Sequence, residues 1–193
     1  MGYPAGFTFP ADKHANRAPY EGRGWCFCES SVGNLVKNTQ QVLDLGLFSG
    51  TKRRERGGTL WLAVIKECVA GRSAPLAPPA FDAILETKSF TSKNADLDKV
   101  KSLYASAFEQ RIGQAEKLDF DQLGWGDAEV KVLSKALHTA KKLEALWLGD
   151  DATPSGDEGG AIGNEGVAAL AAALREGAAP KIKEIHLESM AIG

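Results

Sequence analysis

The sequence has few cysteines, no long apolar run and no excess of basic residues. It holds three cysteines, Cys26, Cys28 and Cys68, and an odd number leaves at least one thiol unpaired. Cys26 and Cys28 are also too close in sequence to form an unstrained disulfide. The cysteines therefore make a poor disulfide framework, and a reducing intracellular compartment fits best.

The chain also lacks the features of a membrane or nucleic-acid-binding protein. Its uninterrupted apolar stretches, such as residues 60–65, are far shorter than the roughly 20 residues that cross a bilayer. With 23 Lys and Arg against 25 Asp and Glu, the net charge is −2, whereas a duplex-binding domain carries a clear basic excess. The first residues, MGYPAGFTFP, show no secretory signal. We expect a cytoplasmic protein with no membrane span and no nucleic-acid partner.

Sequence signatures of common enzymes are missing as well. No phosphate-binding loop, dinucleotide-binding glycine motif or nucleophile elbow occurs, and His14, His138 and His186 have no nucleophile beside them in the sequence. Cys26, Cys28 and His14 lack the second pair of ligands that a structural zinc site needs. We therefore predict no metal, no cofactor and no catalytic residue in a chain that is not an enzyme.

What the sequence does contain is a repeat in its second half. Three segments align with one another: residues 117–137, 143–174 and 182–193. Each aligned line of sequence begins with apolar residues two positions apart. In the first two lines, apolar residues with the spacing of a helix follow. Each complete line predicts a strand, a turn and a helix, and such a unit must stack on a neighbour to cover its apolar face. The aligned positions are Leu118, Leu146 and Ile185; Phe120, Leu148 and Leu187; Trp125, Ile162 and Ile192; Gly126, Gly163 and Gly193; Val130 and Val167; Leu133 and Leu170; and Leu137 and Leu174.

Glycines and prolines indicate the turns of this repeat. We expect Gly163 and Gly166 to make the tight turn before the second helix, where a positive φ is often required. Gly177 and Pro180 are placed to end that helix. Residues 150–160, DDATPSGDEGG, predict a surface loop inserted into the second repeat.

The pattern L-x-x-L-x-L followed by AIGNEGVAALAAAL, residues 161–174, resembles the leucine-rich repeat of the ribonuclease-inhibitor type, which also occurs in NOD-like receptors. The resemblance covers about residues 115–193. It implies an α/β fold, a short solenoid of strand–turn–helix units with two complete repeats and a partial third, whose stacked strands form a concave protein-binding face. The asparagine that follows the strand in that family is replaced here by Leu123, Asp151 and Met190, so no regular asparagine ladder is implied.

Strand positions that alternate with the apolar ones are expected to be exposed on this face. Most of them are acidic, which favours a protein partner with a basic surface. Trp147 is the candidate anchor, because an indole on an open strand face suits an interface hot spot, although residues 150–160 could equally cover it. The predicted partner-binding residues are Asp119, Asp121, Glu144, Trp147, Glu184, His186 and Glu188.

The third line, residues 182–193, supplies a strand and a turn but no helix. An open end leaves apolar side chains in water, and each exposed Leu or Ile forfeits about 1.5–3 kcal/mol. We expect the chain to be a fragment of a longer repeat array. The alternatives are that another part of the chain caps the last strand, or that the open end packs on another chain, as in a structural subunit of a larger assembly.

The first half is predicted to be mostly helical after an irregular arm, residues 1–24. A helix begins near Trp25 with Trp25, Val32, Leu35 and Val36 on one side. Another begins just after Pro79. We expect an N-terminal region over residues 1–78, a helical cap over 79–114 and repeats over 115–193. The best helix, residues 94–112, has Asn94 or Asp96 as its cap and an apolar stripe of Leu97, Val100, Leu103, Tyr104, Ala107, Phe108 and Ile112.

WCFCE, residues 25–29, resembles the W-C-x-x-E segment of Toll/interleukin-receptor domains. In the NAD-cleaving members of that family the glutamate at the position of Glu29 is catalytic. The resemblance implies an alternative function, a signalling protein with a remnant of such a domain. The structural interpretation is that Trp25 and Cys28 belong to the core of a helix and that Glu29 is a surface acid.

Overall fold

The computed structural model describes residues 16–36, 48, 68, 72–121, 123–149 and 162–187, which form a mixed α/β structure. In chain order the elements are η1 (Tyr20–Gly22), α1 (Gly24–Val36), α3 (Pro78–Leu85), α4 (Lys93–Phe108), the π-helical turn η4 (Glu109–Gly113), β1 (Lys117–Asp119), α5 (Asp127–Ala136), β2 (Ala145–Trp147), α6 (Asn164–Arg175) and β3 (Glu184–His186). Within these ranges no helix is both long enough and apolar enough to span a membrane.

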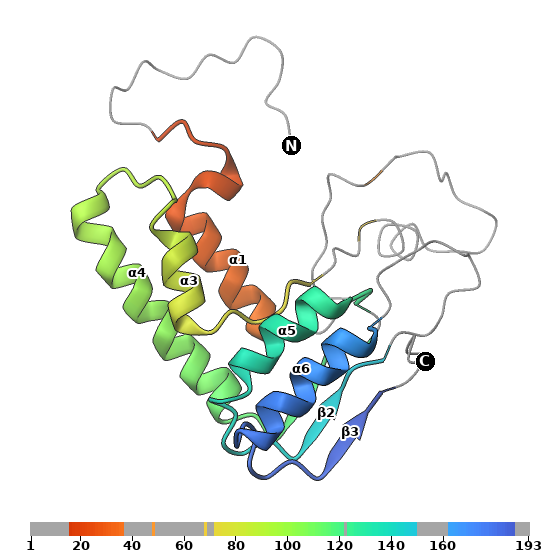
Figure 1. Cartoon of the computed structure of the whole chain (residues 1–193). Helices are drawn as coiled ribbons and strands as arrows, with labels where there is room; N and C mark the ends of the chain where they lie inside the picture. The colour runs from red at the N-terminus through yellow and green to blue at the C-terminus, as the bar shows by residue number, and fades with distance from the viewer. Residues whose placement is uncertain are drawn as a thin grey trace, which may run out of the picture.

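The three strands form one parallel sheet in the order β1-β2-β3. Leu118 pairs in register with Leu146, and Leu146 pairs with Ile185, which confirms the predicted alignment of these three positions. Helices α5 and α6 connect successive strands and lie side by side over one face of the sheet (Figure 1). Alternation along each strand therefore sends one set of side chains towards the two helices and the other set to the opposite face.

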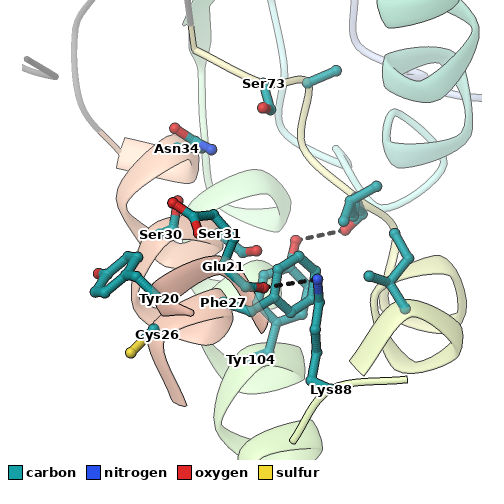
Figure 2. Close-up of a pocket in the computed structure, with 13 residues that line it drawn as sticks. Tyr20, Glu21, Cys26, Phe27, Ser30, Ser31, Asn34, Ser73, Lys88 and Tyr104 are labelled. Atoms are coloured by element: carbon teal, nitrogen blue, oxygen red, sulfur yellow. Dashed lines mark hydrogen bonds between the residues drawn. The ribbon is translucent and has the colours of Figure 1, made fainter. Parts of the chain in front are cut away.

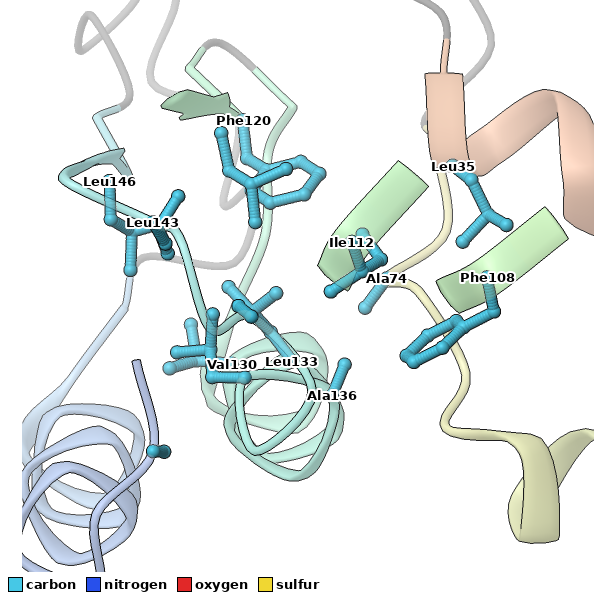
Figure 3. Close-up of a cluster of buried hydrophobic side chains, with 14 of the residues drawn as sticks. Leu35, Ala74, Phe108, Ile112, Phe120, Val130, Leu133, Ala136, Leu143 and Leu146 are labelled. Atoms are coloured by element: carbon cyan, nitrogen blue, oxygen red, sulfur yellow. The ribbon is translucent and has the colours of Figure 1, made fainter. Parts of the chain in front are cut away.

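The core runs continuously from the sheet through α5 into the N-terminal helices. Figure 3 shows Val130 and Leu133 of α5 between Leu146 of β2 and Ile112 of η4. Leu146 on the central strand has no exposed surface, whereas Ile185 on the edge strand β3 is only half-buried. The position of a strand in the sheet thus determines how completely its apolar residue is covered.

Aromatic stacking holds the N-terminal helices together. The rings of Phe81 on α3 and Tyr104 on α4 lie 3.7 Å apart between centroids, at an interplanar angle of 8°. The ring of Phe27 on α1 also stacks on Phe81, with 5.0 Å between the ring centroids. These contacts explain why α1, α3 and α4 pack as one unit, separate in sequence but adjacent in space (Figure 1).

Two predicted core residues of these helices are exposed. Trp25 is 36% exposed and Leu103 is 48% exposed. In α4 the fully buried residues are Val100, Tyr104 and Phe108, which are four positions apart. They form one narrow stripe along which α4 contacts its neighbours. Leu103 lies outside that stripe, although its spacing from Val100 fits a helical pattern.

The predicted helix starts are also displaced. The N-cap of α4 is Ser92, so Asn94 and Asp96 lie in the first turn and do not cap the helix. Helix α3 begins at Pro78 rather than after Pro79, since Ala77 before it is extended. A proline suits the first helical position because its missing N–H would have no intrahelical acceptor there.

The glycines around α6 have other roles than predicted. Gly163, the N-cap of α6, is extended at φ −105°, and Gly166 lies inside the helix, so neither adopts a positive φ. Gly166 is needed for close approach, because a Cβ there would lie 2.7 Å from Asp127 Oδ1. Gly177 does adopt a left-handed conformation, at φ +88°, which confirms its predicted place at the end of the helix.

Candidate functional site

The candidate site is the sheet face opposite α5 and α6, here called the strand face. Its residues alternate with the buried Leu118, Leu146 and half-buried Ile185. The parallel register arranges them in two rows across the three strands. The first row is Lys117, Ala145 and Glu184, and the second is Asp119, Trp147 and His186.

Trp147 lies at the centre of the second row and is half-buried. The ammonium of Lys117 on β1 is 3.4 Å from the centroid of the indole ring. The imidazole centroid of His186 on β3 lies 4.5 Å from the centroid of the indole, and the two ring planes are tilted by 39°. A side chain from each neighbouring strand therefore packs against the indole and limits its rotation. Residues 150–160, predicted to form a surface loop that could cover this tryptophan, lie outside the described residues.

Cations balance the acidic residues on and beside this face. Lys117 Nζ lies 3.3 Å from the Asp119 carboxylate, and His186 Nε2 lies 3.6 Å from that of Glu184. The second contact is an ion pair only when His186 is protonated. Sequence reasoning counted the acids and missed Lys117, although Lys117 occupies the same alternating position on β1 as Glu184 does on β3.

Two of the predicted partner-binding residues lie outside the strands. Asp121 follows β1, and its Oδ1 accepts a hydrogen bond from the backbone N–H of Gly149 at 2.7 Å. This carboxylate holds the chain after β2 against the chain after β1, which is a structural role. Glu144 precedes β2, and its carboxylate pairs with Lys183 Nζ at 2.8 Å. Glu188, the last predicted residue, lies outside the described residues.

Another candidate site is a hollow of about 390 Å³ between α1, α4 and the segment that precedes α3 (Figure 2). The aromatic rings of Phe27 and Tyr104 form part of its wall, and Ser30, Asn34 and Ser73 give it a polar side. Its ionisable groups come from elements far apart in sequence, so only the tertiary structure brings them together.

Two ionisable side chains of this hollow, Tyr104 and Lys88, are engaged in structural contacts. The Tyr104 hydroxyl donates a 2.7 Å hydrogen bond to the carbonyl of Leu76, and burial raises its pKa. Lys88 Nζ donates to the carbonyl of Glu21 at 2.9 Å and lies 4.8 Å above the ring of Phe27. Tyr104 therefore ties α4 to the segment before α3, and Lys88 supports the packing of α1.

Glu29 is exposed on α1 and is not among the residues that line this hollow. Cys28 is buried, and burial, with a smaller effect of Glu29, raises the pKa of its thiol. Trp25 is not core, and the ammonium of Lys99 lies 5.9 Å above its ring. Across the described ranges, no three His, Cys, Asp or Glu side chains gather as metal ligands.

Comparison with known proteins finds no matching family model, no similar curated protein and no similar solved structure. Functional inference therefore depends on the geometry of this chain.

Proposed function

We propose that this chain is a protein-interaction module built on a short leucine-rich-repeat stack, and that the strand face binds its partner. The observation that carries the proposal is the position of Trp147, between Lys117 and His186 on the face opposite the two helices. The parallel register of Leu118, Leu146 and Ile185 supports the repeat.

The energetics of binding favour Trp147 as the anchor. A half-buried indole whose rotamer is already restricted loses little further side-chain entropy when a partner covers it. Its apolar surface then adds to the binding free energy, and tryptophan is enriched among residues whose truncation weakens interfaces strongly.

The charges around Trp147 describe the partner. Glu184 is the more accessible acid, with a side chain that is 67% exposed, and the nearby His186 neutralises it only when protonated. Asp119 already pairs with Lys117, so it attracts a partner less strongly. A matching protein surface presents an apolar side chain to Trp147 and a basic side chain to Glu184.

The test is a selection of binding peptides from a displayed random library on the immobilised chain. Selected sequences are expected to combine an apolar residue with Lys or Arg. The dissociation constant of each peptide is then measured for Trp147→Ala and Glu184→Lys, and both variants are expected to weaken binding at least about tenfold. Thermal melting checks that each variant is folded.

Trp25→Ala is the matched control, because Trp25 is another partly exposed tryptophan with a lysine above its ring. Binding by Trp25→Ala should equal that of the unmodified chain. Peptides that bind both the unmodified chain and Trp147→Ala equally well would show that the strand face is not the binding site.

A further inference from the structure

A separate hollow of about 340 Å³ lies beside the outer strand β1 and concentrates positive charge. It goes beyond the proposed protein-binding role, because Arg72 and Arg111 lie outside the strand face, although the hollow shares Lys117 and Asp119 with that face. Four charged side chains line it, and three cations against one carboxylate leave a local charge of +2 in a chain of net charge −2. The lining residues are Leu35, Arg72, Arg111, Ala115, Lys117, Leu118 and Asp119.

Arg72 provides the most deeply buried cation of this hollow. The residue is only 4% exposed, and its guanidinium lies 4.6 Å above the ring of Phe120. Its backbone carbonyl accepts a 2.5 Å hydrogen bond from the indole N–H of Trp125. Arg72 is thus held at a fixed place, and an arginine stays protonated even where burial disfavours its charge.

Arg111 provides an accessible cation. It lies on the π-helical turn η4 and is exposed. Its guanidinium makes no ion pair and no side-chain hydrogen bond with the residues that the structure describes. The third cation, Lys117, already pairs with Asp119 at 3.3 Å. The donors of Arg111 are therefore available to a ligand.

The lining determines which anion fits. A guanidinium presents parallel N–H donors that match the two oxygens of a carboxylate. The apolar side chains of Leu35, Ala115 and Leu118 suit a ligand that carries carbon next to its charge, and they offer no hydrogen bonds to the remaining oxygens of a phosphate. We propose that this hollow binds a carboxylate attached to a short apolar segment, either a small free acid or an acidic side chain of a protein.

Titration calorimetry at low ionic strength tests the proposal with three probes. Succinate represents the free acid, a blocked Ala-Glu-Ala tripeptide represents the acidic side chain, and inorganic phosphate is the oxyanion without carbon. The variant is Arg111→Gln, which removes the charge at an exposed position. Arg175→Gln is its matched control, because Arg175 is an exposed arginine on α6 and does not line the hollow.

We expect at least one carboxylate probe to bind more tightly than phosphate. Its dissociation constant should rise at least about tenfold in Arg111→Gln and stay unchanged in Arg175→Gln. Preference between succinate and the tripeptide identifies the source of the carboxylate. The proposal is overturned by phosphate binding as tight as that of either carboxylate, by equal affinities in the unmodified chain and Arg111→Gln, or by no carboxylate binding at about 10 mM.

Discussion

Asp127 on α5 accepts a hydrogen bond on Oδ1 from the backbone N–H of Gly163, the N-cap of α6, at 2.7 Å. The same oxygen accepts a second one from the N–H of Gly166 at 2.9 Å. A glycine N-cap has no side chain that could accept from the N–H of Gly166, so the carboxylate of Asp127 on α5 takes this role. The negative charge also suits the positive end of the α6 dipole. Asp127 therefore couples α5 to the start of α6.

Asp127→Ala should lower the free energy of unfolding by about 1–2 kcal/mol, because α6 loses its cap. Asp127→Asn keeps an acceptor oxygen and should cost less. Denaturation in urea measures both variants, with Asp98→Ala on the exposed surface of α4 as control. A stability of Asp127→Ala equal to that of the control would refute the capping role.

Gly166→Ala should destabilise the chain by about 1–3 kcal/mol. Its Cβ would lie 2.7 Å from Asp127 Oδ1 and 3.2 Å from the backbone Cα of Asp127, so α5 and α6 would have to separate. Gly33→Ala is the control, since Gly33 lies within α1 and a Cβ there meets nothing within 4 Å. That substitution should stabilise by about 0.5–1 kcal/mol. Thermal denaturation should show a lower melting temperature for Gly166→Ala and a higher one for Gly33→Ala. Melting temperatures that shift in the same direction would contradict the close contact at Gly166.

The cost of truncating an aligned strand residue should depend on whether its strand is central or at the edge of the sheet. Leu146→Ala removes a fully buried side chain from the central strand and should cost about 2–5 kcal/mol. Ile185→Ala on the edge strand, where the side chain is half-buried, should cost clearly less. Equal losses in urea denaturation would mean that the edge strand is as well covered as the central one.

Tyr104→Phe should lower the free energy of unfolding at neutral pH by about 0.5–1.5 kcal/mol, because the carbonyl of Leu76 loses its donor. Burial raises the pKa of Tyr104 in the folded chain, whereas an unfolded tyrosine titrates near about 10. The stabilisation by Tyr104 is thus fully present below that pH and is lost as the pH rises above it, since the unfolded chain then releases a proton more readily.

The stability difference between the unmodified chain and Tyr104→Phe should therefore shrink above about pH 10. Urea denaturation across neutral and alkaline pH measures it. Tyr20→Phe serves as the control, because Tyr20 is 54% exposed and should change stability little. A difference that stays constant with pH would contradict the burial of the Tyr104 hydroxyl.

Local periodicity was sufficient to predict much of the fold. Leu118, Leu146 and Ile185 pair in the expected register, because residues two apart point to one face of any strand. The helical spacing of Val130 and Leu133 likewise predicted the buried side of α5. Such patterns depend only on neighbouring residues and on the geometry of a strand or helix.

Periodicity failed where a helix contacts neighbours on a narrow side. Trp25 and Leu103 fit the helical patterns and are nonetheless exposed, because the number and direction of packing partners are not encoded in the spacing. For the candidate site, the pattern placed Asp119, Trp147, Glu184 and His186 on one face. It did not reveal that Lys117 lies above the indole.

The amino-acid order thus specifies which residues form strands and helices and which sides of them are apolar. The folded chain specifies which carboxylates serve structure, as Asp121 does at Gly149 and Asp127 does at Gly163, and which cations gather beside β1. The physical reason is distance along the chain. A hydrogen bond or charge contact between residues about 30 positions apart forms only after the helices and strands have packed together, and no local pattern records it.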